Sequence, residues 1–323
     1  MPFIGVFGAD QTSKAAFLNS VSKKNESEGM AIYHRDASGR RFLFLDDQRY
    51  PEKIQGYARI ASISDHAYYI FPKYAKMTPP DGELAMLLQS FRLRGSVVVL
   101  DGGASAEDVV SVFRGTSLSG FSVDHRSASS SVMDLSVVEE SGSFPRDGTL
   151  IHVDRTFNVK GVGTVALGFV LSGRVSVHDD LRTIPHPAGK TVEVRGIQIN
   201  DEDVESAGRG CRVGLSLRGA DAAELGRTAW LDDGSCRLGD SLAFQFEPCP
   251  YYRQGIDGRD LHLQVPGETV TSKVSSAGRG FLARLPHPVP VWQGMRVAVL
   301  DLNGKSLRVA GGGLCMEGAQ ADG

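Results

Sequence analysis

The sequence lacks the features that mark secreted, zinc-binding and membrane proteins. Its four cysteines have no CxxC spacing and no histidine at a zinc-ligand interval, so buried thiols in a reducing compartment are expected. No stretch approaches the roughly 20 consecutive apolar residues of a membrane span. The first ten residues carry no basic segment followed by a long apolar run, so no secretory signal is expected. We therefore expect a cytoplasmic protein with no metal site and no membrane partner.

An excess of charge of one sign is also missing. Residues 1–147 carry 16 basic and 18 acidic side chains, 148–232 carry 10 and 11, and 233–323 carry 9 and 9. No part of the chain is therefore a basic nucleic-acid clamp, and no DNA partner is expected. Any contact with RNA would depend on a local patch. The length of 323 residues indicates two or three domains.

The first part of the chain alternates short apolar strands with segments of helical spacing. Strands are predicted over 3–8, 41–45, 68–71 and 97–100, and helices over 14–21, 81–93 and 106–113. A polar segment is expected between the second and third strands. Residues 97–100 form an uninterrupted apolar strand of the kind that parallel sheets bury. These patterns predict an α/β domain with a mostly parallel sheet over residues 1–147.

The rest of the chain has the pattern of β-barrels. Short alternating strands in residues 148–232 are separated by glycine turns, as at Gly161 and Gly163, where two strands reverse direction. Such a series is typical of a small closed barrel. Further alternating strands are predicted in residues 233–323, over 261–265, 269–274, 281–285 and 296–300. The expected fold class is thus α/β followed by two all-β domains.

Several motifs resemble the translational GTPases, the group of EF-Tu and the selenocysteine-specific elongation factor. Asp154–Phe157 with Lys160–Thr164 is similar to the DRVFxIKGxGTV opening of the family's second domain, and Val192–Gln198 is similar to its VRSIQ strand. Leu307–Gly313 resembles the RxxGGG ending of the third domain in the selenocysteine factor and the initiation-factor-2 γ subunit. The resemblance implies a shrunken P-loop GTPase-like domain over 1–147, an EF-Tu domain 2-like barrel over 148–232 and a domain 3-like barrel over 233–323.

The first strand–loop–helix unit is where the resemblance places a phosphate-binding loop. Such a loop needs glycine before its lysine and a hydroxyl residue after it, because backbone N–H groups bind phosphate and the hydroxyl binds Mg²⁺. Gly8 and Lys14 are kept, but Ser13 replaces the second glycine. Ala15 replaces the hydroxyl residue and cannot bind a cation. Nucleotide binding with magnesium is therefore expected to be lost here.

The family's other nucleotide motifs are altered too. Where the family has DTPGH after its third strand, Asp46 is kept, but Arg49 stands at the glycine position and Tyr50 at the histidine position. The NKxD motif, whose aspartate binds guanine, is replaced by a segment that begins at Asp101 and ends without a carboxylate. A Ser-Ala pair at 127–128 is similar to the element that supports the guanine ring.

Two interpretations of Gly8, Lys14 and Asp46 remain open. They could bind a nucleotide without magnesium-dependent hydrolysis, or they could be structural remnants, with Lys14 on a solvated helix start. Because the altered residues of these motifs act on one transition state, we predict a pseudo-GTPase with no catalytic residue and no cofactor. The alternative is a divergent but active GTPase that binds GTP or GDP with Mg²⁺.

Basic side chains on or near the barrel motifs are the candidates for RNA binding. They are Arg155, Lys160, Arg195, Arg209 and Arg212. Each could equally be a solvated surface charge. The resemblance implies a partner in translation: tRNA, the ribosome or another translation factor. An interaction scaffold with no RNA role is the remaining alternative.

Overall fold

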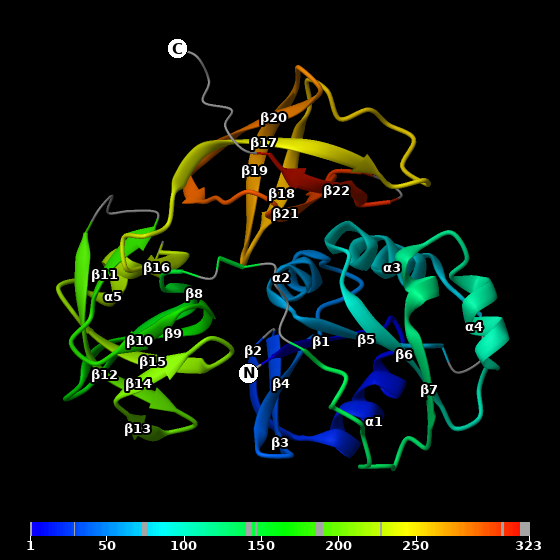
Figure 1. The fold of residues 1–323 in the computed structure, drawn as a ribbon, viewed down its shortest axis with the longest axis horizontal. Helices are drawn as coiled ribbons and strands as arrows, with labels where there is room; N and C mark the ends of the chain where they lie inside the picture. Colours follow the sequence, from blue (N-terminus) through cyan, green and yellow to red (C-terminus); the bar gives the residue numbers. More distant parts are fainter. Residues whose placement is uncertain are drawn as a thin grey trace.

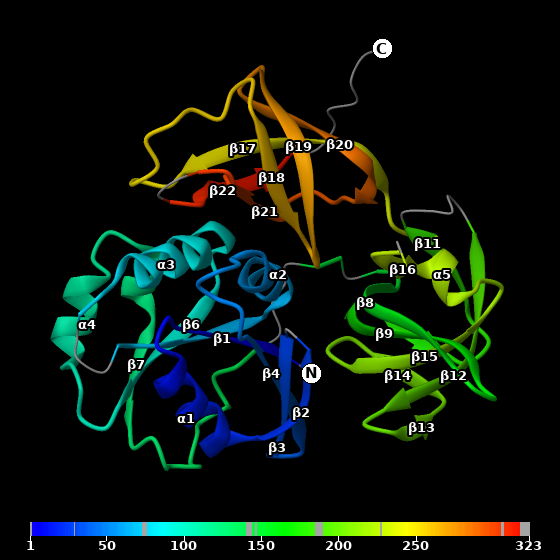
Figure 2. The same ribbon diagram turned by 180° about the vertical axis from the view of Figure 1, so that it is seen from behind.

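The computed structural model describes residues 2–28, 30–72, 76–139, 144–145, 147–184, 190–226, 228–304 and 307–316. Figure 1 shows an α/β part, a first β-barrel beside it and a second barrel across the top of the molecule. The view from behind in Figure 2 shows the second barrel resting on helices α2 (Gln55–Ile63) and α3 (Pro79–Phe91). No helix in the described ranges has the length and apolar content needed to cross a membrane.

The first part contains a seven-stranded mixed sheet in the order β2-β3-β4-β1-β5-β6-β7. Strands β4, β1, β5, β6 and β7 are parallel, and β2 and β3 form an antiparallel extension at one edge. The mostly parallel sheet is confirmed. Its strands are β1 (Phe3–Phe7), β2 (Lys23–Glu28), β3 (Met30–Ala37), β4 (Arg40–Asp47), β5 (His66–Ile70), β6 (Arg94–Leu100) and β7 (Ser122–Arg126).

Alternation along β1 divides the apolar side chains between the two faces of the sheet. Phe3 and Phe7 join the cluster that contains α2, α3 and α4 (Ala106–Val112), whereas Ile4 and Val6 join the cluster that contains α1 (Gln11–Val21). Residues Leu135 and Val138 complete the second cluster. An extended segment after β7 therefore covers part of the face that α1 packs against.

Two features of this domain differ from the sequence-based expectations. The segment between β4 and β5 is not simply polar, because it contains α2, which buries Tyr57, Ala58 and Ala61. Its apolar residues stand at helical spacing, a signal that could have predicted this helix. The antiparallel strands β2 and β3 had no predicted counterpart. Helix α2 and the strand pair β2–β3 both lie beside the loop that follows β4.

The second part is a closed barrel. Six strands pair in the cycle β11-β16-β8-β9-β15-β12, and β12 pairs back with β11; β13 extends the sheet from β12. A two-stranded sheet of β10 and β14 accompanies the barrel. The elements are β8 (Leu150–Val159), β9 (Gly163–Ser172), β10 (Arg174–Ser176), β11 (Asp180–Ile184), β12 (Thr191–Ile199), β13 (Glu202–Val204), β14 (Ser206–Gly208), β15 (Arg212–Arg218), α5 (Ala222–Leu225) and β16 (Trp230–Asp232).

The third part is a second six-stranded barrel in the order β17-β20-β19-β18-β21-β22, with β22 paired to β17. The four predicted strands lie within it, whereas β17, which pairs antiparallel with both β20 and β22, had no predicted counterpart. Its strands are β17 (Leu238–Pro248), β18 (Asp260–Val265), β19 (Glu268–Ala277), β20 (Gly280–Pro290), β21 (Arg296–Leu300) and β22 (Val309–Cys315). The predicted two-barrel architecture is confirmed.

The three parts contact one another through specific groups. Arg209 of the first barrel pairs with Asp65 of the α/β domain. The indole N–H of Trp230 donates to the carbonyl of Pro266 in the second barrel at 2.8 Å. In β22, a Cβ at Gly312 would stand 2.6 Å from the Ser90 carbonyl oxygen of α3, so this position must lack a side chain. The glycine-rich ending predicted from the sequence is thus a close contact between domains.

Candidate nucleotide site and basic surface

The loop between β1 and α1 holds the groups that a phosphate-binding loop would use. Asp10 caps α1: one carboxylate oxygen accepts the backbone N–H groups of Thr12 at 3.0 Å and Ser13 at 3.2 Å. The other carboxylate oxygen accepts the Ser13 hydroxyl at 2.7 Å. A helix N-terminus favours an anion because its first N–H groups have no partner within the helix. Here a carboxylate of the chain fills that position.

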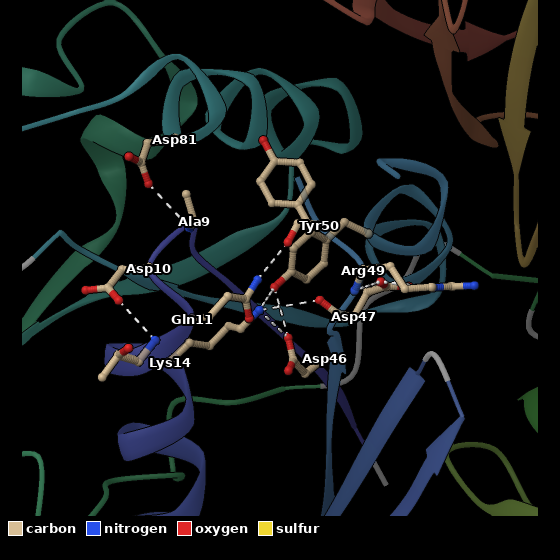
Figure 3. Close-up of polar contacts among 11 residues, drawn as sticks. Ala9, Asp10, Gln11, Lys14, Asp46, Asp47, Arg49, Tyr50 and Asp81 are labelled. Carbon is tan, nitrogen blue, oxygen red and sulfur yellow. Dashed lines mark hydrogen bonds and ion pairs between the residues drawn. The ribbon is translucent and has the colours of Figure 1, made fainter. Parts of the chain in front are cut away.

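A second carboxylate reaches the same loop from α3. The N–H of Ala9 donates to Asp81 at 3.4 Å, and Asp81 is buried where it also caps α3 through Thr78. Figure 3 shows Asp10 and Asp81 on either side of the loop. Gly8 is tightly enclosed, since a Cβ there would lie 3.1 Å from the Ile70 carbonyl oxygen. The glycine of the loop therefore has a steric role in addition to any nucleotide role.

Lys14 does not lie on a solvated helix start. Its side chain is fully buried, and its Nζ stands 2.7 Å from Oδ1 of Asp46, which is also buried. Nζ also donates to the Tyr57 hydroxyl, and that hydroxyl donates to Asp46 Oδ1 at 2.9 Å. Figure 3 shows Lys14 directed across the site toward Asp46 and Asp47. The expectation of a solvated lysine is wrong, because α2 brings Tyr57 over this side chain.

Burial perturbs the titration of this cluster. Desolvation lowers the pKa of the Lys14 ammonium, and the charge of Asp46 opposes that change. Desolvation raises the pKa of Tyr57 well above its ordinary value, and the neighbouring Asp46 carboxylate adds to the increase. At neutral pH Tyr57 is therefore a neutral hydroxyl that serves as donor to Asp46. The cluster pairs one cation with one anion and leaves no excess positive charge for a phosphate.

Asp47 and Arg49, which follow Asp46 in the chain, form a second ion pair within the protein. The Asp47 carboxylate is buried; it accepts the N–H of Arg49 at 2.8 Å and pairs with the Arg49 guanidinium at 2.5 Å. Gly56 provides the space, since a Cβ there would lie 1.5 Å from Asp47 Oδ2. Arg49 stands where the family has glycine. Its guanidinium is engaged by Asp47, and its N–H is engaged as well.

Tyr50, which stands where the family has histidine, points toward α3. Its hydroxyl donates to the Pro80 carbonyl at 2.6 Å and lies 3.2 Å from Glu83. Burial raises the pKa of Tyr50, and the Glu83 charge contributes to the increase. Arg308 from the second barrel pairs with Glu83 at 2.5 Å, and its guanidinium lies 5.8 Å from the centre of the Tyr50 ring. Tyr50 thus contributes to a contact between domains.

The residues at the position of the family's base-recognition motif also form a hydrogen bond within the chain. Asp101, at the end of β6, accepts the N–H of Ala128 at 2.9 Å. Ala128 belongs to the Ser-Ala pair that resembles the family's guanine-supporting element. A carboxylate of this chain therefore meets the backbone group of that pair. In the parts of the chain that the structure describes, no group of three or more His, Cys, Asp or Glu residues is placed to hold a metal ion.

The five RNA-binding candidates lie in two different environments. Arg155, Lys160 and Arg195 are exposed on the first barrel, and Arg195 pairs with Glu193 at 2.7 Å. Arg209 is largely engaged, because it pairs with Asp65, donates to the Leu171 carbonyl and lies over Phe144. Arg212 is buried and pairs with Asp154 at 2.7 Å. The structure does not bring the five together as one patch.

Comparisons with known proteins agree with this architecture. The family model of elongation factor Tu domain 2 matches residues 163–231. The selenocysteine-specific elongation factor of Methanocaldococcus jannaschii is 38% identical over 86 residues, which are 27% of this chain and 18% of that protein. The solved bacterial selenocysteine-specific elongation factor EF-Sec superposes with a TM-score of 0.82 at 19% identity, covering 97% of this chain and 58% of that chain. Residues 163–231 thus match the elongation factor Tu domain 2 family, and nearly the whole chain shares the fold of the bacterial selenocysteine-specific elongation factor.

Two further similar proteins match this chain over most of its length. An uncharacterized protein of Methanocaldococcus jannaschii is 25% identical over 298 residues, which are 91% of this chain and 94% of that protein. The elongation factor SelB of Methanococcus maripaludis, solved with the GTP analogue GppNHp, gives a TM-score of 0.78 at 20% identity and covers 99% of this chain and 80% of that chain. This chain spans about a fifth of the curated selenocysteine factor from Methanocaldococcus jannaschii.

The resemblance to translational GTPases implies a magnesium-bound guanine nucleotide, and the side chains present do not fit that group. Ala15 has no oxygen to offer a cation, and Lys14 is already paired with Asp46 inside the protein. A triphosphate at the start of α1 would meet the carboxylates of Asp10 and Asp81, which are anions themselves. The residues that would bind a magnesium-bound triphosphate are therefore incomplete. The carboxylates of Asp10 and Asp81 would also repel the phosphates at the start of α1.

Proposed function

We propose that this protein is a translation elongation factor-like protein that acts in the cytoplasm without hydrolysing GTP. The observation that carries the proposal is the buried ion pair of Lys14 and Asp46, the two polar residues of the nucleotide motifs that are kept. In a phosphate-binding loop the lysine must extend toward the phosphates. Turning Lys14 outward would leave Asp46 buried without its cation, which is strongly unfavourable.

The other contacts of the site support the same proposal. Asp10 and Asp81 bind the loop's N–H groups, and Asp101 binds the N–H of Ala128. Phosphoryl transfer depends on positioning and on stabilising the charge of the transition state, with Mg²⁺ as a central part. Each of these contacts lies where a nucleotide would need a donor. The chain would thus maintain the fold of the GTPase domain with internal carboxylates.

We further propose that the first barrel provides an RNA-binding surface for tRNA or the ribosome. Support comes from the exposed cations Arg155, Lys160 and Arg195 on β8, on the β8–β9 turn and on β12. Arg209 and Arg212 are expected to act indirectly, by holding the barrel against Asp65 and by ordering Asp154. Their guanidinium groups are already used within the protein. The alternatives for this surface are another translation factor or a scaffold with no RNA role.

Filter binding to bulk tRNA across a salt series tests the RNA proposal. Affinity should fall as salt rises, because phosphate contacts release counterions. Arg155→Ala and Lys160→Ala should each weaken binding and reduce the salt slope by about 1. Arg114→Ala, at an exposed site of the α/β domain, is the matched control and should bind as the parent does. Binding that is absent or independent of salt would leave the protein-interaction alternatives.

The rival function is a divergent but active GTPase. It predicts GTP turnover, alone or with ribosomes, that disappears in Lys14→Ala. Our proposal predicts no turnover above a protein-free control in either variant. A turnover that survives Lys14→Ala would indicate a contaminating enzyme, and the preparation would be repeated with a further purification step.

A further inference from the structure

The first barrel has an apolar core of its own. Its six strands close into a cycle, because β12 pairs back with β11. The buried apolar side chains of this barrel form a cluster that is separate from the clusters of the other two domains. Examples from four of its strands are Val153, Val170, Val194 and Leu215. A domain with a closed sheet and its own core has what an independently stable unit requires.

The second barrel is closed as well, but its core is not separate. Its buried apolar side chains belong to the same cluster as the side chains of α2 and α3. Helix α2 contacts β18 and β19, and α3 contacts β21 and β22 (Figure 2). Leu87 and Leu88 of α3 are in one cluster with Val297 and Val299 of β21. Pulling the second barrel away from these helices would therefore expose part of a core that both domains share.

The backbones of these two domains also meet in places where no side chain would fit between them. A Cβ at Gly312 of β22 would lie 2.6 Å from the Ser90 carbonyl oxygen of α3. The N–H of Gly267, in the turn between β18 and β19, donates to the Ser62 hydroxyl of α2 at 3.0 Å. The ion pair of Arg308 adds a third connection. Interiors packed this closely transmit strain, so we expect the two domains to open together.

The first barrel is attached to the other two domains in a different way. Its Arg209 pairs with Asp65, and the ring centres of Phe169 and Phe3 lie 5.4 Å apart. The side chains through which it joins the shared cluster do not belong to its own core: Leu150, Phe169, Leu171, Ile184 and Trp230. Separating the first barrel would expose these side chains, but its own core would stay intact.

We propose that the α/β domain and the second barrel open as one cooperative unit, and that the first barrel opens as a second unit by itself. The first unit is discontinuous in sequence, because the elements from β8 to β16 lie between its two parts. The first barrel can then change its position while the other two domains keep theirs. This inference is independent of the proposed function, since it concerns only which contacts break together.

Native-state hydrogen exchange of the full-length protein in increasing urea, followed by mass spectrometry, tests the proposal. Opening free energies and urea slopes report which segments lose protection in the same event. Peptides from β5 and β6 should share both quantities with peptides from β18, β21 and β22. Peptides from β8, β9 and β15 should exchange in a separate event with a smaller urea slope, because a single barrel exposes less surface. The proposal is overturned if all three domains open together, or if the second barrel opens without the α/β domain.

Matched variants then perturb one unit at a time. Gly312→Ala, which places a Cβ against Ser90, should accelerate exchange by about tenfold or more in β21 and also in β5, and leave β9 unchanged. Leu215→Ala, in the core of the first barrel, should accelerate exchange by about tenfold or more in β8 and β9, and leave β5 and β21 unchanged. Gly255→Ala, where a Cβ would meet nothing within 4 Å, is the control and should change none of these strands.

Two results with the variants would contradict the proposal. One is acceleration in Gly312→Ala that is confined to the second barrel. The other is acceleration in Leu215→Ala that extends to all three domains. If either variant does not fold, the urea series on the parent protein decides the question.

Discussion

The ammonium of Lys14 lies 2.7 Å from the carboxylate of Asp46, and neither side chain is exposed to solvent. In sequence the two residues are the kept parts of two separate nucleotide motifs. In the structure they neutralise each other, and Tyr57 of α2 closes the site over them. The pairing places both side chains in the protein interior. The stability of the fold should therefore depend on residues that a working GTPase reserves for its nucleotide.

Breaking this pair should destabilise the protein more than removing it entirely. Lys14→Met leaves the Asp46 carboxylate buried without its cation, so we expect a loss of about 3–5 kcal/mol in urea unfolding. Adding Asp46→Leu should recover part of that loss, because no unpaired charge then remains. Arg41→Met, which breaks the exposed Arg41–Asp36 pair, is the control with a much smaller effect. Additive losses in the double variant would contradict the coupling.

Gly56 should be essential for the shape of the same site. Its Cβ in Gly56→Ala would fall 1.5 Å from Asp47 Oδ2, so α2 and the Asp47–Arg49 pair would have to shift apart. We expect a loss of more than about 2 kcal/mol in chemical unfolding. Gly82→Ala in α3 is the matched control: its Cβ meets nothing within 4 Å, and alanine there should be neutral or stabilising by about 0.5–1 kcal/mol.

Arg308 should hold the second barrel against the α/β domain. It pairs with Glu83 at 2.5 Å and donates to the carbonyls of Pro51 and Glu52. Arg308→Met should increase protease cleavage between the barrels and increase the radius of gyration in solution scattering. Arg92→Met removes the exposed pair with Glu247 across the same interface and should change neither. Equal behaviour of the two variants would show that Arg308 has no special role.

Stability should fall as the pH decreases below about 6.5. Burial lowers the pKa of His66 to about 4 in the folded protein from an ordinary value of 6.5. Between these values the unfolded chain binds a proton that the folded protein does not, so the stabilisation present above pH 6.5 is lost toward pH 4. Unfolding midpoints at pH 7.5, 5.5 and 4.5 would show the decline. His66→Phe, which keeps a ring beside Tyr68, should have a shallower dependence on pH.

The sequence predicted the architecture because its barrel strands have short, regular patterns. A hairpin is indicated by the motifs Asp154–Phe157 and Lys160–Thr164, and the structure contains it as β8 and β9. Helix α2 was missed although Ile54, Tyr57, Ala58 and Ala61 have helical spacing, because Gly56 and polar neighbours dilute the pattern. The altered nucleotide motifs could be recognised residue by residue in the sequence, whereas the inward direction of the Lys14 side chain could not be predicted from them. That Lys14 turns inward depends on Tyr57, which is 43 residues away in sequence.

The contact of the three domains around His152 shows a different limit of sequence reasoning. Arg59, His152 and Glu268 have no common motif, and each comes from a different domain. Only the packing of the turn at Gly267 against the His152 ring reveals that one of its nitrogens is buried without a partner. Sites formed between domains need the arrangement of those domains before they can be recognised.

The most direct test of the central claim is a calorimetric titration of the full-length protein with GTP and Mg²⁺. The account predicts no saturable heat, because Lys14 is paired with Asp46 and Asp10 occupies the start of α1. A saturable, magnesium-dependent heat with the parent protein would contradict it.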